Sequence, residues 1–193
     1  MKSATPVTWQ ENLVSPEKVL EHIEVGMNIF ISTGVAEPRT MVKHLMGSDT
    51  LKMHDLTLIQ LVSFGDAISL EELRSKRYRL KTFYSGWVAN AAVAAGRVDL
   101  IPSRVSEIPR LIYKRYIPID AALIQISEPN EAGYCSLGVA VDVARLAIEQ
   151  ASMVVGEISA DIPNTSGDTY LHLSEFDFLV ESTEPPFYFP VGR

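Results

Sequence analysis

Residues 27–38, which read MNIFISTGVAEP, decide how the chain folds. A short apolar run ends in small residues, and Glu-Pro then leads into an apolar-periodic segment that continues to about Met46. This order predicts a buried strand over 28–32, a tight turn, and a helix that begins at Glu37. Gly34 permits backbone conformations that other residues avoid, and Pro38 suits the first turn of a helix, where its missing N–H costs nothing.

The predicted turn is a candidate site for an anion. Backbone N–H groups at the start of a helix lie at the positive end of the helix dipole, where carboxylates and phosphates bind well. The alternative is an ordinary strand-to-helix turn that binds nothing. One glycine turn by itself does not decide between the two.

Apolar runs that alternate with helical patterns extend this arrangement along the chain. We expect further strands over 56–62, 80–84, 98–101, 121–127, 134–137, 153–158 and 176–180, and helices over 16–25, 69–74, 87–95, 106–112 and 139–151. Such alternation predicts an α/β fold, with an open, mostly parallel sheet flanked by helices on both faces. Sheets of this kind bind ligands at the carboxyl ends of their strands.

The turns after the first three strands share small or hydroxyl residues, at 32–34, 63–65 and 84–86. If these strands are parallel neighbours, Ser63 and Ser85 lie at the same edge of the sheet as Gly34. Together the turns would offer hydroxyl and N–H donors to one anionic group. The alternative is that turns are simply rich in Gly and Ser.

Composition limits the classes of function. The 193 residues are 47% hydrophobic, which suits one domain with a sizeable core, and they carry a net charge of −7 that disfavours nucleic acid and anionic membranes as partners. No apolar run approaches the length of a membrane span, and the first residues lack the apolar core of a secretory signal. The single cysteine, Cys135, suits a reducing compartment. We therefore expect a cytoplasmic protein in which Cys135 is a small buried residue.

Several familiar sites are missing from the sequence. The first turn lacks G-x-G-x-x-G, no Walker loop occurs, and the four histidines do not have metal-ligand spacing. The serines of the second and third turns have no evident His/Asp partner for a hydrolase triad. We assign four further carboxylates to solvated faces or caps rather than to catalysis: Glu107, Glu157, Glu175 and Asp177. From the residues alone we predict an α/β domain that binds a small anion.

Seven segments follow one another in the order of a known family. They are GVAEP at 34–38, YSG at 84–86, AGRVDLIP at 95–102, SEIP at 106–109, AALIQIS at 121–127, GYCSLG at 133–138 and HLSEFD at 172–177. With them the chain resembles the acetyl-CoA hydrolase/transferase family, which includes 4-hydroxybutyrate, acetate and butyrate CoA-transferases. The resemblance covers about residues 19–184, nearly the whole chain.

The resemblance implies two similar α/β domains of a three-layer, Rossmann-like kind that face each other across a cleft. In this family a glutamate attacks the acyl-CoA thioester, and CoA passes to a second carboxylic acid through a covalent glutamyl intermediate. A hydrolase lets water intercept an intermediate instead. That glutamate and the glycine-rich CoA-binding motifs lie in the second domain, and this chain has no matching segment. The resemblance therefore implies an amino-terminal domain over 1–183, the start of an interdomain linker over 184–193, and no activity for this chain alone.

By the same resemblance, this domain completes the carboxylate end of the cleft and contains no catalytic residue. The substrate-binding positions that it implies are Gly34, Ala36, Glu37, Ser63 and Ser85, with Glu37 as a positioning residue. We expect as partners an acyl-CoA, a short-chain carboxylic acid, a carboxy-terminal catalytic domain and further copies of the chain. CoA enters as substrate, and the resemblance implies neither a cofactor nor a metal.

Two departures from the family pattern keep other hypotheses open. Asn90 stands where many relatives have Arg, and Asn164 stands where many have the Arg of Pro-Arg-Thr, so both remove a cation. A non-catalytic acyl-CoA or carboxylate-binding module that regulates a partner domain is the alternative. A sugar-phosphate isomerase-like protein would require a self-contained acid/base site, which we cannot assemble from these residues.

Overall fold

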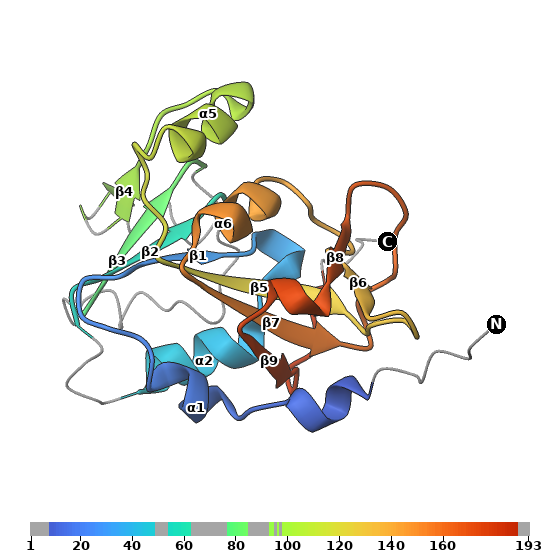
Figure 1. Ribbon diagram of the computed structural model, residues 1–193. Coiled ribbons are helices and arrows are strands. Elements are labelled where there is room, and N and C mark those ends of the chain that lie inside the picture. Colours follow the sequence, from blue (N-terminus) through green and yellow to red (C-terminus); the bar gives the residue numbers. More distant parts are fainter. Residues whose placement is uncertain are drawn as a thin grey trace, which may run out of the picture.

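Seven strands form the central sheet of the computed structural model, which describes residues 8–48, 54–62, 77–84, 93–94, 96 and 98–188 (Figure 1). In spatial order they are β4 (Val98–Leu100), β3 (Tyr78–Thr82), β2 (Leu56–Gln60), β1 (Asn28–Ile31), β5 (Ala121–Ser127), β7 (Met153–Ser159) and β9 (Phe178–Glu181). Every pair of neighbours is parallel. The predicted α/β class is therefore confirmed.

Helices cover both faces of this sheet (Figure 1). On one face lie α1 (Pro16–Leu20) and α2 (Arg39–Gly47), and on the other lie α5 (Ile108–Tyr113) and α6 (Ala144–Gln150). Successive side chains of β1 point to opposite faces, so Ile29 and Ile31 join the core under α1 and α2, while Phe30 joins the core under α5 and α6. All of β5 is buried, as expected for a central strand that is covered on both faces.

The strand order reverses beside β1. The chain builds β2, β3 and β4 outward on one side of β1, and then crosses to β5 on the other side and continues to β9. The carboxyl ends of β1 and β5 thus flank a topological switch point, where open parallel sheets bind their ligands. The turn at 32–38 follows β1 at this point.

Three predicted helix starts are wrong, and one of them is that of the helix predicted from residue 106, which begins at Ile108. The helix predicted over 139–151 begins only at Ala144, because Asp142 has a positive φ of 33° and its carboxylate accepts hydrogen bonds from the N–H groups of the next two residues. The helix predicted from Glu37 begins at Arg39, with the proline just before its first residue.

The predictions also miss some short elements. The strand β6 (Tyr134–Ser136) was predicted over 134–137, but its antiparallel partner β8 (Tyr170–His172) was not. The described residues also contain four 3-10 turns that were not predicted: η1 (Trp9–Asn12), η2 (Gly34–Ala36), η3 (Val105–Glu107) and η4 (Leu173–Glu175). The helices predicted over 69–74 and 87–95 lie outside the described residues, apart from two helical residues at 93 and 94.

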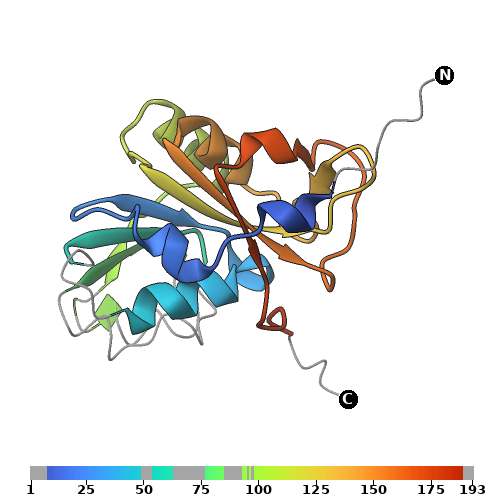
Figure 2. The same ribbon diagram turned by 60° about the horizontal axis from the view of Figure 1, so that its bottom comes forward.

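The two ends of the described chain meet the sheet at β9. Val14 N donates to Leu179 O at 2.9 Å, so the segment before α1 covers the outer edge of this strand. Residues 182–188 continue from β9 past the carboxyl ends of the strands and lead to the C-terminus (Figure 2). The exit of the chain therefore lies at the same edge as the switch point.

Candidate functional site

The turn after β1 is hydrogen-bonded to the end of β2. Thr33 Oγ1 accepts bonds from Leu61 N at 2.9 Å and from Val62 N at 3.3 Å, and Gly34 N donates to Val62 O at 3.3 Å. Gly34 has a φ of 61°, where a residue without a Cβ is favoured. These contacts hold the turn in one position at the switch point.

Glu37 points into the protein and contacts Gln60. Glu37 is 4% exposed, and Gln60 at the end of β2 is fully buried. Gln60 Nε2 donates to Glu37 Oε2 at 2.8 Å and to Ser32 O at 3.2 Å. These two acceptors fix the orientation of the Gln60 amide and, through it, one oxygen of the carboxylate. Such a geometry suits a positioning group better than an exposed nucleophile.

A second buried carboxylate occupies the start of α2. Glu157 in β7 is fully buried, and its carboxylate accepts hydrogen bonds from Met41 N at 2.9 Å and Thr40 N at 3.2 Å. The Ser182 hydroxyl donates to Glu157 Oε1 at 2.7 Å. Burial raises the pKa of Glu157, and the hydrogen bonds from these three residues oppose the rise. Of the two roles predicted for Glu157, a solvated face or a cap, the structure shows the cap, since this side chain is fully buried.

This contact overturns the prediction of free N–H groups at the start of the helix. Two of those groups, on Thr40 and Met41, bind Glu157, and Val42 N donates to Pro38 O at 3.0 Å. The chain itself therefore supplies the acceptor group that occupies the start of the helix. The sequence does not reveal this because Glu157 lies 117 residues beyond Thr40.

Buried polar atoms without partners gather at the carboxyl ends of the strands. Gln125 in β5 is 1% exposed, and neither its Nε2 nor its Oε1 has a hydrogen-bond partner in the part of the chain that the structure describes. Within the same part of the chain, Gln60 Oε1 and the Tyr84 hydroxyl also lack one. Unpaired buried polar atoms are costly, and each one calls for an explanation such as a functional role. They mark this edge as a candidate site independently of any family.

Sequence reasoning missed Gln60 and Gln125. Each stands inside an apolar run that predicts a buried strand, near the carboxyl end of that run. A lone amide in such a run is the signal that would have found them. Both lie on the sheet face under α2, because Leu58 and Leu123, two residues earlier on the same strands, belong to that core.

The prediction of three clustered turns is tested only in part. The strands β1, β2 and β3 are parallel neighbours, so their carboxyl ends meet at one edge. Gly34, Ala36 and Glu37 follow β1 at this edge, and all three are buried. Ser63 and Ser85 lie outside the described residues, and ligand binding by any of the five positions stays a prediction.

Other reactive side chains have structural partners. Cys135 is fully buried, as predicted, and burial raises the pKa of its thiol to about 12. His172 caps η4 by accepting a hydrogen bond from Ser174 N at 3.2 Å, and Glu175 completes this capping box. Asp177 Oδ2 accepts a bond from Val154 N at 2.8 Å.

Two classes of feature are absent from the described ranges. No group of three or more His, Cys, Asp or Glu side chains there has the arrangement of a metal site. None of the helices described is long and apolar enough to cross a membrane.

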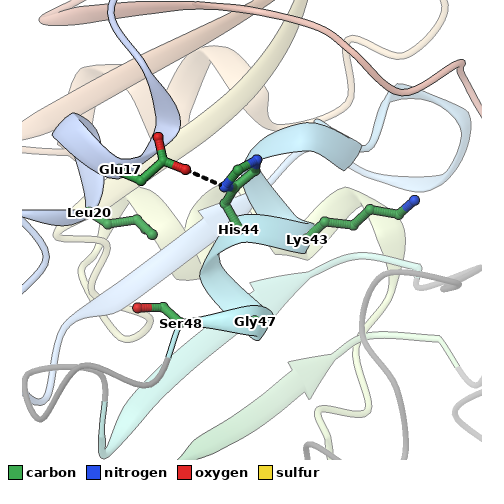
Figure 3. A pocket seen from close by; sticks show the side chains of 6 residues that line it. All are labelled: Glu17, Leu20, Lys43, His44, Gly47 and Ser48. Carbon is green, nitrogen blue, oxygen red and sulfur yellow. Dashed lines mark ion pairs between the residues drawn. The ribbon is translucent and has the colours of Figure 1, made fainter.

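A pocket of about 340 Å³ lies between α1 and α2, away from the switch point (Figure 3). It is lined by Glu17, Leu20, Lys43, His44, Gly47 and Ser48. His44 Nδ1 lies 2.8 Å from Glu17 Oε1, but the His44 side chain is half-buried and the Glu17 side chain is exposed. Ser48 O, at the end of α2, already accepts a hydrogen bond from Arg77 Nη1 at 2.6 Å. This pocket therefore offers no buried or unpaired group that would bind a ligand.

Comparison with known proteins decides the family. The model of the acetyl-CoA hydrolase/transferase N-terminal domain matches residues 2–189. The chain belongs to this family. The 4-hydroxybutyrate coenzyme A transferase of Clostridium kluyveri is 33% identical over 177 residues, which are 92% of this chain and 41% of that protein. The succinyl-CoA:acetate/propanoyl-CoA:succinate CoA transferase of Fasciola hepatica is 32% identical over 185 residues, which are 92% of this chain and 36% of that protein.

Several solved structures share the fold of this chain. A 4-hydroxybutyrate CoA-transferase from Porphyromonas gingivalis matches with a TM-score of 0.71 and 26% identity, covering 96% of this chain and 44% of that one. RipA from Yersinia pestis matches with a TM-score of 0.85 and 25% identity, covering 96% of this chain and 45% of that one. A chain of the decarboxylase AibA/AibB, at 17% identity and a TM-score of 0.54, shares the fold alone, and the match covers 82% of that chain. This family domain thus spans less than half of the curated CoA transferases that it matches.

Proposed function

We propose that the full-length protein containing this chain transfers CoA between a short-chain acyl-CoA and a carboxylic acid. Membership of the acetyl-CoA hydrolase/transferase family over residues 2–189 carries this proposal. The names of the curated relatives support it, because they describe CoA transferases that act on 4-hydroxybutyrate, succinate, acetate and cyclohexane-1-carboxylate.

The proposed reaction proceeds by covalent catalysis. A glutamate of a second domain attacks the thioester carbonyl, so that CoA leaves as the thiolate and a mixed anhydride remains on the glutamate. The thiolate then attacks the glutamyl carbonyl, which releases the first acid and leaves a glutamyl thioester. The second acid attacks that thioester and takes the CoA by the reverse steps.

This domain would form the wall of the site that faces the carboxylate. The turn that carries Gly34, Ala36 and Glu37 lies at the switch point, and Ser63 and Ser85 follow the neighbouring strands β2 and β3 in sequence. We assign the donor role to the Ser63 and Ser85 hydroxyls, because hydroxyl donors would stabilise the negative charge that develops on the reacting oxygens. The buried carboxylates Glu37 and Glu157 are held by hydrogen bonds, so we assign neither of them the role of nucleophile.

The test uses the full-length protein and the isolated chain in parallel. Each is mixed with acetyl-CoA and a panel of acids, namely butyrate, 4-hydroxybutyrate and succinate, and new acyl-CoA species are measured by mass spectrometry. We expect transfer by the full-length protein, none by the chain alone, and loss of transfer when the second-domain glutamate is replaced by alanine. Release of free CoA without a new thioester would favour a hydrolase.

One result would favour the binding module instead. If the full-length protein exchanges no thioester with any acid, the proposed activity is wrong. Tight binding of CoA or a short acid to the chain alone, measured by calorimetry, would then support a non-catalytic acyl-CoA or carboxylate-binding module.

A further inference from the structure

The segment that leaves β9 is attached to the first turn of α2 by one hydroxyl. Thr40 is 1% exposed, and its Oγ1 accepts hydrogen bonds from Thr183 N at 2.9 Å and from Glu184 N at 3.2 Å. One buried oxygen thus satisfies two successive backbone N–H groups that have passed the end of the strand. Without it, both groups would lose their partner in this region.

Two cations on the same face of α2 extend this attachment. Arg39 Nη1 donates to Pro185 O at 2.7 Å, and Lys43 Nζ lies 2.6 Å from Glu184 Oε2. The hydrogen bond from Lys43 lowers the pKa of Glu184, so this carboxylate stays charged at neutral pH. The exit segment, residues 182–188, is therefore held by three residues of α2, namely Arg39, Thr40 and Lys43, although its composition is that of a linker.

The same contacts reach the sheet and the candidate site. Glu157 Oε1 accepts hydrogen bonds from Thr40 N at 3.2 Å and from the Ser182 hydroxyl at 2.7 Å, which joins β7, α2 and the exit segment at one point. Thr40 is the second residue of α2 and stands three residues after Glu37. Its contacts thus set the course of the exit segment relative to the turn at the switch point.

We infer that Thr40 is a positioning residue for the reaction: it fixes where the chain departs toward the second domain and thereby where that domain meets the Gly34–Glu37 turn. The inference rests on the proposed function, which supplies the second domain. Reactions between groups carried by two domains are sensitive to such placement, since a displacement of about 1 Å can cost on the order of 100-fold in rate. An unattached linker would leave the two walls of the site free to separate.

The test compares Thr40→Val with the matched control Thr40→Ser in the full-length protein. Valine keeps the shape of the side chain and removes the acceptor, whereas serine retains the acceptor, and both keep the backbone N–H that binds Glu157. In the valine variant we expect hydrogen exchange at the Thr183 and Glu184 amides to accelerate at least about tenfold, because both lose their acceptor. We expect its kcat for CoA transfer, measured well below the thermal midpoint, to fall at least about tenfold. The thermal midpoint itself falls because two N–H groups lose their acceptor, while the serine variant stays close to wild type.

Glu184→Gln provides a second variant that cannot disturb the core. It removes the charge that pairs with Lys43 and leaves the Thr40 bonds in place, so we expect a smaller fall in kcat in the same direction. Faster exchange at residues 183 and 184 with unchanged kcat would overturn the inference and leave the proposed function intact. Unchanged exchange in the valine variant would overturn it as well. A wild-type protein that transfers no CoA would overturn the proposed function, and the inference with it.

Discussion

Replacing Gln125 by methionine should stabilise the fold. Gln125 is 1% exposed and neither of its amide atoms has a hydrogen-bond partner among the described residues, so folding removes the amide from water without compensation. An unsatisfied buried polar group costs about 1–3 kcal/mol, and methionine has nearly the same length and adapts its shape to its surroundings. We expect the free energy of unfolding to rise by about 1–2 kcal/mol, which corresponds to a rise in Tm of about 2–8 °C for a domain of this size.

Gln60→Met is the matched comparison. The wild-type Gln60 amide is also buried, but Gln60 Nε2 donates to both Glu37 Oε2 and Ser32 O. Methionine removes both bonds and leaves a buried carboxylate oxygen without this donor, so we expect a loss of about 1–3 kcal/mol. Urea titration followed by circular dichroism measures both variants. A Gln125→Met variant that is less stable than wild type would refute the reasoning, because it would mean that the amide has a partner, such as an ordered water.

The stability and the activity of the Gln125→Met variant together also show whether Gln125 serves the site. Residues that reduce stability are often retained because a site needs them. If Gln125→Met stabilises the isolated chain and lowers CoA transfer by the full-length protein, the amide serves the site. Equal activity would assign Gln125 no role in it.

Three further predictions follow from single side chains. Burial raises the pKa of Glu157 in the folded chain, so the wild-type contribution of this carboxyl to stability is fully present below the unfolded pKa near 4.5 and declines as pH rises through the folded pKa. The free energy of unfolding of the wild type relative to Glu157→Gln, measured by urea titration, should therefore fall from pH 4 to pH 8, and a difference that rises with pH would contradict the raised pKa. Cys135, fully buried with a pKa of about 12, should react with Ellman's reagent at pH 8 only on unfolding, and rapid labelling of the native chain would contradict its burial. Gly138→Ala should lower the free energy of unfolding by more than about 1 kcal/mol, because the φ of Gly138 is 64° and the added methyl group would meet the side chain of Ile162. Calorimetry that shows an unchanged Tm would argue against this packing.

Some sequence predictions failed because hydrophobic periodicity does not reveal the polar contacts that start a helix or fill its first turn. The apolar spacing over 139–151 is helical throughout, but the backbone turn at Asp142 and its bonds to the next two N–H groups delay the helix to Ala144. The turn after β1 was predicted correctly as a turn, yet its expected free helix start is filled by Glu157. Periodicity reports which face of an element is apolar and says nothing about which polar group from elsewhere will cap it.

What the sequence determined by itself is most of the strands and helices that the structure describes, their alternation, and the resemblance to the family. Apolar periods of two and about four residues are local properties, and β5 over 121–127 was predicted to the residue. Only the tertiary structure decided the strand order, the contact of Gln60 with Glu37, the capping of α2 by Glu157, and the attachment of the exit segment to Thr40. These contacts join residues from 23 to 143 positions apart, and such pairs meet only when the sheet assembles and buried polar atoms compete for the partners within reach.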